Sequence, residues 1–384
     1  MQDFAALFDN GDTPNLDVVD GTMVKPRVVS IFSGCGGLDY GFHMEGYDTI
    51  WANDFAEWAC KSFATNFGEV VHLKDITKIN PYTDQTIPEC DIVLGGFPCQ
   101  DFSIIWKQPG LNGTRGGLFR HFAEFVDAKT PKAFVAENVK GLLTANGGKA
   151  IDTIVRDFES ISPGYVVKPH LYNFAEYGVP QFRERVLIVG VRLDTGFDFV
   201  HPKPTHGPDA LLPYVTAGEA LKGADKVATN NEKINIRQKT RKILELIPEG
   251  GNFADIPPEH PLYVKGMISH VYRRIKRSEP AKTIIAAGGG GTWGYHYPEP
   301  RPLTNRERAR LQSFPDSFTF EGTVAEVRRQ IGNAVPPEGV RELAKRLLPL
   351  FTGNYERKNL RPEYDKMKAM TIKDRLEYVT AQMK

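Results

Sequence analysis

Short apolar runs alternate with longer amphipathic stretches over the first half of the chain. The runs VVSIF, DIVLGGF, AFVA and VLIVGV are rich in Val, Ile and Phe and lie between polar or glycine-containing segments, which is typical of buried strands. Between such runs, residues 55–63, 117–129 and 147–161 carry apolar side chains at helical spacing. Strands that alternate with helices predict an α/β fold with a doubly wound, mostly parallel sheet.

The alternation stops after Leu193, where Pro and Gly become frequent. One clear amphipathic helix, IRQKTRKILELIPEG, stands in an otherwise irregular stretch, and helical patterns return in TNRERARLQSF and VRELAKRLLPLF. The charged C-terminal stretch also has a helical pattern, and we expect it to be peripheral. These shifts divide the chain into a polar leader (1–26), a sheet domain (27–193), a smaller irregular domain (194–290), a return to the sheet domain (291–352) and a charged tail (353–384).

Composition narrows the class of protein. The 48 Lys and Arg residues are balanced by 47 Asp and Glu, so a site for a polyanion has to be local. No apolar run is long enough to span a bilayer, and the acidic N-terminus is unlike a secretory signal, so we expect a cytoplasmic protein. The four cysteines are far apart and lack CxxC or Cys/His spacing, so we expect reduced thiols and no metal.

A glycine-rich turn, FSGCGG, follows the first strand and would let backbone N–H groups approach a ligand. It does not fit the dinucleotide pattern G-x-G-x-x-G, because Asp39 occupies the third glycine position. Asp54 ends the next strand, where a carboxylate can accept ribose hydroxyls. Asp75 ends what looks like a third strand and suits an adenine amino group. A merely tight turn is the alternative for the glycines.

Cys99 comes directly after Pro98, at the end of the run DIVLGGF. A packed core thiol is the common role of a free cysteine. Cys99, however, lies just beyond the carboxyl end of a predicted strand, where α/β enzymes build their sites, and Pro98 fixes the local backbone. A nucleophilic role requires a polar, partly exposed setting that favours the thiolate.

Two further motifs carry charged side chains. Glu137 ends the run AFVA, and apolar surroundings tend to raise the pKa of a carboxyl group, so Glu137 could donate a proton to a ring nitrogen. A helix cap or a structural ion pair is the alternative. In QFRER, strand alternation puts Arg183 and Arg185 on one face, so that their guanidinium groups could converge on a common acceptor. An ordinary ion-paired strand end is the alternative here.

Taken in order, the motifs FSGCGG, GFPCQ, ENV, QFRER and IGNAVP resemble the DNA cytosine-C5 methyltransferases of bacterial restriction-modification systems. The resemblance extends from Val28 to about Leu348 and implies the fold of S-adenosylmethionine-dependent methyltransferases, with 194–290 as the target-recognition domain. It also implies methyl transfer from S-adenosylmethionine to carbon-5 of a flipped cytosine in a short specific sequence of double-stranded DNA. Asp54 and Phe55 stand where the family often has Glu–Trp, which keeps a carboxylate followed by an aromatic ring.

The resemblance implies a role for each matching residue. Cys99 would add to carbon-6 of the cytosine, and Glu137 would bind N3 and the amino group. Arg185 would bind O2, with Arg183 supporting the site. The cofactor would lie against Phe32, Gly34, Gly36, Gly37, Asp54, Phe55, Asp75, Ile76, Pro98, Leu118, Asn333 and Val335. DNA would be contacted by a mobile loop at 100–117 with Gln100, Ser103 and Arg115, and by the basic cluster Arg273, Arg274, Lys276 and Arg277, for which a solvated charged face is the alternative.

Other functions are open at this point. The tRNA-methylating enzymes of the same fold typically carry PPCQ where this chain has FPCQ at 97–100. A nucleotide-dependent oxidoreductase is disfavoured by the glycine spacing, and a non-catalytic DNA-binding module by the complete set of Cys99, Glu137 and Arg185. We expect a monomer that associates with the nucleoid when bound to DNA and has no membrane partner. The chain itself says nothing about a cognate restriction endonuclease.

Overall fold

The computed structural model describes residues 18–19, 22–23, 25–98, 117–263, 265–266, 271–286 and 294–383. The chain folds into two compact units. The larger unit comprises the described residues within 12–173, 184–203 and 340–384, and the smaller one those within 174–183 and 204–339. No helix among the described residues combines the length and the apolar character of a membrane span.

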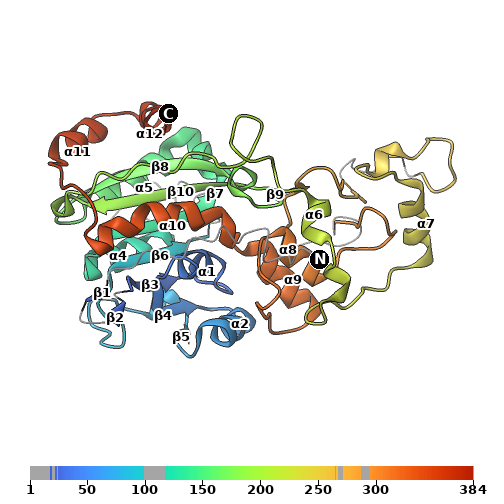
Figure 1. The fold of residues 1–384 in the computed structure, drawn as a ribbon, viewed down its shortest axis with the longest axis horizontal. Coiled ribbons are helices and arrows are strands. Elements are labelled where there is room, and N and C mark those ends of the chain that lie inside the picture. The colour runs from blue at the N-terminus through green and yellow to red at the C-terminus, as the bar shows by residue number, and fades with distance from the viewer. Residues whose placement is uncertain are drawn as a thin grey trace, which may run out of the picture. The chain divides into compact units, whose positions relative to one another are not determined.

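Among the described residues of the larger unit, seven strands form one sheet (Figure 1). The strands in their order across the sheet are β5 (Val71–Leu73), β4 (Asp48–Asp54), β3 (Arg27–Ile31), β6 (Ile92–Gly96), β7 (Ala133–Val139), β10 (Glu184–Arg192) and β8 (Tyr165–Asn173). The first five are parallel, and β10 runs antiparallel to both of its neighbours. The prediction of a doubly wound, mostly parallel sheet is therefore confirmed.

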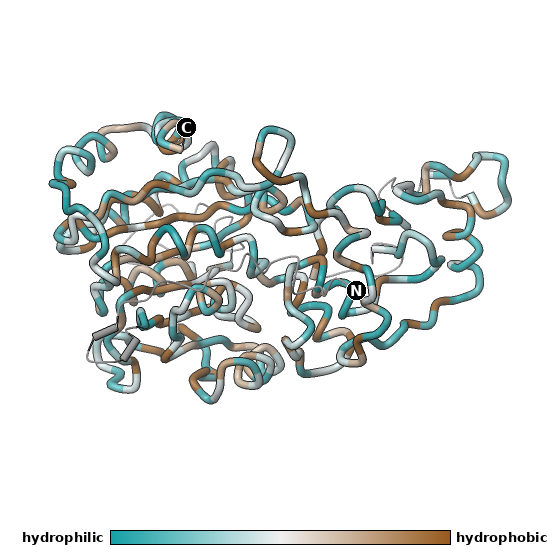
Figure 2. The backbone as a smooth tube through the Cα atoms, viewed as in Figure 1, coloured by the Kyte–Doolittle hydropathy of each residue, from teal (hydrophilic) through white to brown (hydrophobic). Residues whose placement is uncertain are grey.

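Helices cover both faces of this sheet. The helices of the larger unit are α1 (Gly37–His43), α2 (Glu57–Phe67), α4 (Phe119–Lys129), α5 (Lys149–Ser160), α10 (Pro337–Thr352), α11 (Arg361–Lys368) and α12 (Ile372–Gln382). Phe122 of α4, Phe158 of α5 and Ile31 of β3 belong to one buried core, in which Phe158 packs on Phe122. Ser30, which points to the opposite face, meets α1. The central strands of the sheet are among the more hydrophobic parts of the described residues (Figure 2).

The helical pattern of the charged tail is confirmed, and its helices pack on β8, the outermost strand, with several side chains buried there. Met367 of α11 and Val379 of α12 are buried in a cluster with Val166 of β8. The Arg375 guanidinium is also buried; it lies 2.6 Å from a carboxylate oxygen of Glu159 and donates to the Val167 carbonyl oxygen. The tail is thus an amphipathic cover on β8, the last strand of the sheet, with its charged residues mostly on the outer side.

We expect Arg375→Met to lower the free energy of unfolding by about 3–5 kcal/mol, because the change leaves the Glu159 carboxylate buried without its cation. The double variant Arg375→Met/Glu159→Gln should recover a large part of that loss, since no unpaired charge is left. Urea unfolding measures both values. Arg361→Met is the matched control, because its ion pair with Asp365 is exposed and should contribute little. A loss for Arg375→Met no larger than that of the control would contradict the prediction.

The smaller unit is built from short elements. They are β9 (Gln181–Phe182), α6 (Ala217–Leu221), α7 (Gln238–Leu246), β11 (Ala281–Lys282), α8 (Asn305–Leu311) and α9 (Val324–Asn333), and β11 pairs with β9 in parallel. A separate two-stranded hairpin, β1 (Val18–Val19) and β2 (Thr22–Met23), precedes the large sheet. Residues 291–339, which we predict as a return to the sheet domain, group with the smaller unit, and 194–203 group with the larger one.

Candidate active site

The glycine-rich turn lies where the strand order of the sheet reverses. Because β3 has β4 on one side and β6 on the other, the turn after β3 and the residues after β6 share the carboxyl edge at which doubly wound proteins bind ligands. Gly34 and Gly36 have φ angles of 55° and 91°, which favour glycine. A Cβ atom on Gly36 would in addition overlap the Phe67 ring. The turn is thus fixed in shape by its sequence.

Asp54 holds this turn from the end of β4. One carboxylate oxygen accepts the Gly34 N–H at 2.8 Å and the other accepts the Ala56 N–H at 2.9 Å. Burial raises the pKa of Asp54. The Phe55 N–H also bonds to this carboxylate. A carboxylate has about four acceptor sites, so one is left for a ligand hydroxyl, and the predicted ribose contact is compatible with this geometry.

The residues that follow Asp54 and Asp75 differ in their exposure. The Phe55 side chain is 73% exposed, which is unusual for a large ring and leaves its face free to stack. Asp75 accepts bonds from the backbone N–H and the hydroxyl of Thr77, and these hold its pKa below the usual range. The Ile76 side chain, by contrast, is buried in the core, so only its backbone could reach adenine.

The other predicted cofactor residues are distributed over both units. In the larger unit Phe32 has a positive φ angle of 53° and packs with Leu118 against the core. Pro98 is half-buried at the end of β6. Asn333, which is exposed, and Val335, which is buried, belong to the smaller unit.

Glu137 lies beside the end of β6. In the β6–β7 register it is opposite Gly96, and a Cβ atom on Gly96 would come within 2.9 Å of the carboxylate. The Arg185 Nε atom is 2.9 Å from the other carboxylate oxygen, and both side chains are largely buried. Glu137 is therefore ion-paired, and its partner is another residue that the sequence singles out. Gly96, three residues before Cys99 in the sequence, has no side chain and so leaves room for the Glu137 carboxylate.

The two arginines of QFRER point to different acceptors. Arg183 stands between β9 and β10, so the strand alternation that would align it with Arg185 is interrupted there. It is fully buried and donates to the carbonyl oxygens of Ile284 at 3.1 Å and Gly332 at 2.9 Å. These acceptors differ from the Glu137 carboxylate that Arg185 contacts, so the described bonds do not show the two arginines converging on a common acceptor. Arg183 ties backbone segments of the smaller unit together.

Gln181, which the sequence analysis does not single out, belongs to the same buried network. Its amide donates to the side chain of Gln312 at 2.9 Å and accepts the backbone N–H of Ile284 at 2.7 Å. Gln312 in turn donates to the carbonyl oxygen of Ile331. These bonds connect β9, the non-strand segment after β11 and the end of α9. A polar residue that opens a strand motif is the only sequence signal for this role.

Asn138 is a second residue that the sequence analysis does not single out. Its side chain is buried, donates to the Phe97 carbonyl oxygen at 2.9 Å and accepts the Val139 N–H at 2.9 Å. Phe97 belongs to GFPCQ, so Asn138 connects that motif to ENV. An asparagine inside an apolar run is the signal that could have found it, because a buried amide requires partners.

Several predicted residues lie outside the part of the chain that the structure describes. They are Cys99, Gln100, Ser103 and Arg115.

The basic cluster at 273–277 is partly internal. Arg274 is buried and donates to carbonyl oxygens of Leu244, Ile247, His296 and Tyr297, so its prediction as a DNA contact is wrong. A guanidinium with five donors satisfies carbonyl groups that loops leave unpaired. Arg277 is exposed but pairs with Glu249 at 2.9 Å and lies over the Tyr297 ring, and Lys276 is 3.9 Å from Glu279. Arg273 is half-buried.

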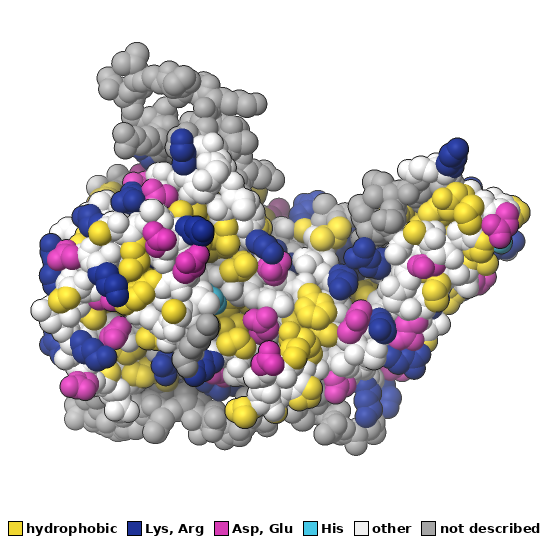
Figure 3. Space-filling view, turned by 90° about the horizontal axis from the view of Figure 1, so that it is seen from above, with side chains coloured by type: hydrophobic (Ala, Val, Ile, Leu, Met, Phe, Trp, Pro, Cys, Tyr) yellow, Lys and Arg dark blue, Asp and Glu magenta, His cyan; other side chains and the backbone are white. Residues whose placement is uncertain are grey.

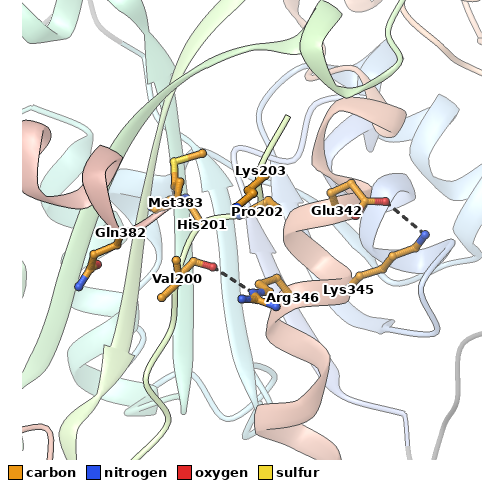
Figure 4. A pocket seen from close by; sticks show the side chains of 9 residues that line it. All are labelled: Val200, His201, Pro202, Lys203, Glu342, Lys345, Arg346, Gln382 and Met383. Atoms are coloured by element: carbon orange, nitrogen blue, oxygen red, sulfur yellow. Dashed lines mark hydrogen bonds and ion pairs between the residues drawn. The ribbon is translucent and has the colours of Figure 1, made fainter. Parts of the chain in front are cut away.

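A cavity of about 510 Å³ lies elsewhere in the larger unit, between α10, the segment 200–203 and the end of α12 (Figure 4). It is lined by Val200, His201, Pro202, Lys203, Glu342, Lys345, Arg346, Gln382 and Met383. No predicted site residue is among them. Lys345 is paired with Glu342 at 3.3 Å, and Arg346 donates to the Val200 carbonyl oxygen. We therefore do not include the cavity in the candidate active site.

Asp39 is a buried acid in the first turn of α1, the helix that follows the glycine turn. The hydroxyls of Ser30 and Thr49 donate to its carboxylate at 3.0 and 3.2 Å. Burial raises the pKa of Asp39 to about 6, well above its usual value of 3.8. The folded protein therefore binds this proton more tightly than the unfolded chain. The contribution of Asp39 to stability is present at low pH and is lost as the pH rises from about 4 to about 6.

We expect Asp39→Asn to become more stable relative to the parent across that window, by on the order of 3 kcal/mol, because the amide does not have to ionise in the core. Urea unfolding at several pH values from about 4 to about 7 measures the difference. Asp48→Asn on β4 is the control, since Asp48 is exposed and should show no such window. A difference between variant and parent that stays constant over the pH range would refute the assignment.

Comparison with known proteins identifies a family for this chain. The model of the family described as C-5 cytosine-specific DNA methylase matches residues 26–348. The Type II methyltransferase M.NgoFVII of Neisseria gonorrhoeae is 66% identical over 358 residues, which cover 92% of this chain and 95% of the relative. The Type II methyltransferase M.BbvI of Brevibacillus brevis is 41% identical over 353 residues, covering 85% of this chain and 92% of the relative.

The fold also resembles solved structures. A prophage-encoded E. coli protein described as a DNA modification methyltransferase matches with a TM-score of 0.65 and 22% identity, over 85% of this chain and 99% of that chain. The S. pombe Dnmt2 methyltransferase matches with a TM-score of 0.54 and 17% identity, over 85% of this chain and 99% of that chain. At these identities the likeness concerns the fold.

Proposed function

This chain belongs to the C-5 cytosine-specific DNA methylase family, and we propose that it methylates one cytosine of a short duplex DNA sequence with S-adenosylmethionine as methyl donor. It is a DNA (cytosine-5-)-methyltransferase, and its relatives are Type II enzymes. The observation that carries the proposal is the Glu137–Arg185 pair beside Gly96, at the strand end that leads to Cys99.

The proposed roles follow from what each group can do to a cytosine ring. Carbon-5 is a weak nucleophile until a thiolate adds to carbon-6, and Cys99 is the thiol that follows β6. Glu137 holds N3 and the amino group of the base, where charge develops after the addition, and Arg185 holds both Glu137 and O2. With the methyl group supplied by S-adenosylmethionine, carbon-5 would become methylated. Solvent water would then take the carbon-5 proton, and the electrons of that C–H bond would form the carbon-5–carbon-6 double bond as Cys99 leaves as a thiolate.

The base has to leave the duplex for this chemistry, because carbon-6 is not accessible inside the stack. Asn138 and Arg183 act as positioning residues. Asn138 fixes the backbone of Phe97, two residues before Cys99, and Arg183 fixes the segment that leads into Arg185.

The residues around the glycine turn fit S-adenosylmethionine. Gly34 and Gly36 give the turn a shape that a ligand can approach closely, Asp54 offers an acceptor site to a ribose hydroxyl, and Phe55 offers a free ring face to adenine. When bound, the cofactor supplies an activated methyl group. Asp75 follows β5, which pairs with β4 so that Leu73 is opposite Asp54, and would accept the adenine amino group.

We expect Phe55→Ala to raise the KM for S-adenosylmethionine about tenfold with little change in kcat, because stacking on an aromatic ring contributes about 1–3 kcal/mol per base. Since the ring is mostly exposed, the fold should be unaffected. Initial rates at varied cofactor concentration measure the effect. Tyr82→Ala removes another exposed ring and is the control. An unchanged KM in Phe55→Ala would remove Phe55 from the cofactor site.

The function is tested by bisulfite sequencing of DNA from cells that express the chain, which reports the methylated base and its sequence context together. We expect 5-methylcytosine at one position of a short recurring sequence. The purified protein should also transfer label from tritiated S-adenosylmethionine to duplex DNA and leave tRNA unlabelled. Equal labelling of tRNA, or DNA methylation without sequence preference, would overturn the proposal.

A further inference from the structure

Helix α7 of the smaller unit begins with a dense group of basic side chains. Four of the six residues from 237 to 242 are cations, and all four are exposed. We call them the α7 patch: Arg237, Lys239, Arg241 and Lys242. None of the four side chains has an ion pair or a hydrogen bond among the described residues.

The cations in the previously predicted cluster at 273–277 are mostly engaged. Arg274 satisfies backbone carbonyl groups in the interior, Arg277 is held by Glu249, and Lys276 is close to Glu279. The α7 patch, by contrast, carries four exposed cations without an ion-pair partner among the described residues. Acidic and basic side chains are interspersed over much of the surface seen in Figure 3, so a local excess of one sign is a distinct feature.

The fold holds the α7 patch in place but does not neutralise it. Ile243 and Leu244 anchor the helix from its buried side, and Ile243 packs with Phe253 in a small core. No acidic residue occupies the first turn of the helix, and the nearest acids in sequence are Glu232 and Glu245, which form no ion pair with the patch. Like charges at this spacing repel one another, so folding alone gives no reason for their accumulation.

We propose that the α7 patch binds the phosphate backbone of DNA independently of base sequence. This inference rests on the proposed function, which makes DNA the polyanion that the smaller unit meets. Lys and Arg side chains on a helix bind phosphates as charges and by hydrogen bonds, and each neutralised phosphate releases condensed counterions. The patch thus adds affinity and salt dependence, whereas the choice of sequence depends on other residues of the unit.

The test measures binding of a mixed-sequence duplex of about 30 base pairs by fluorescence anisotropy, at salt concentrations from about 50 to 200 mM. We expect the triple variant Lys239→Gln/Arg241→Gln/Lys242→Gln to flatten the slope of log K against log salt by about 0.9 for each phosphate that the variant no longer neutralises. Affinity at the highest salt concentration should change least. The recognised sequence, determined by bisulfite sequencing, should stay the same.

The matched control, Lys149→Gln/Lys222→Gln/Lys373→Gln, removes the same charge from exposed positions outside the patch. A slope in the α7 variant equal to that of the control would overturn the proposal. The single variant Lys239→Gln, expected to flatten the slope by about 0.9, keeps the test decisive if the triple variant unfolds. Methylation of plasmid DNA by the parent is measured first: a parent that forms no 5-methylcytosine contradicts the proposed function, whereas an active parent with unaltered slopes in the variants contradicts only the patch.

Discussion

Cys99→Ser should reduce methyl transfer by at least about a thousandfold while leaving the affinity for S-adenosylmethionine nearly unchanged. A serine hydroxyl is a far weaker nucleophile than a thiolate at neutral pH, and no neighbouring base is proposed to activate it. Asp54 ends β4 and Phe55 follows it directly, so neither of these proposed cofactor contacts is altered by the change. Single-turnover methylation of a confirmed target duplex, together with cofactor binding by calorimetry, measures both quantities.

The covalent step has an independent readout. A target duplex that carries 5-fluorocytosine should trap an adduct with the parent, because the proton whose loss releases the enzyme is missing, and Cys99→Ser should form none. Cys90→Ser is the control: Cys90 is buried before the opposite end of β6, and its variant should both turn over and form the adduct. Turnover by Cys99→Ser at a rate near that of the parent would falsify the mechanism.

Glu137→Gln should lower kcat by about a hundredfold to a thousandfold, since the amide can no longer hold N3 of the base as a carboxyl group does. The change keeps the size of the side chain beside Gly96, but it also leaves Arg185 without its counter-charge. The unfolding midpoint therefore has to be measured with the rate. If the loss is catalytic, KM for the cofactor stays close to that of the parent.

Glu184→Gln is the matched control for this variant. Glu184 is adjacent to Arg185 in sequence but pairs with Lys140 at the surface, at 2.8 Å, so its neutralisation should leave kcat unchanged. Equal losses in both variants would show that the effect is a general response to removing a charge from this part of the sheet. In that case the assignment of Glu137 to the cytosine ring would be wrong.

Most of the large sheet could be predicted from the chain because its strands are continuous apolar runs. The first four residues of the run VVSIF lie within β3, and VLIVGV lies within β10. The strand β8 was not predicted, because Lys168 and His170 interrupt its apolar pattern. Lys168 is nonetheless buried, at 3.5 Å from Asp198 and 3.4 Å from Glu363. Partners this distant in sequence give no local signal.

Partners that are distant in sequence also explain which site residues could be predicted and which were missed. Glu137 and Arg185 were found because charged residues at strand ends are conspicuous, and the structure pairs them. Arg274 looked like a surface cation because a guanidinium that satisfies backbone carbonyl groups has the same sequence signature as one that faces solvent. Asn138 is uncharged, and its role depends on the Phe97 carbonyl oxygen at the end of the neighbouring strand.

The position of α11 and α12 has a consequence for how copies of this chain behave when crowded. An outermost strand with free backbone groups is a template onto which another polypeptide can add. At one margin β5 is only three residues long, and at the other the nine-residue β8 is overlaid by the terminal helices, with Arg375 bonded to the Val167 carbonyl oxygen. Shortened chains that end near residue 353 should therefore self-associate through β8, whereas intact molecules gathered on one stretch of DNA should remain separate.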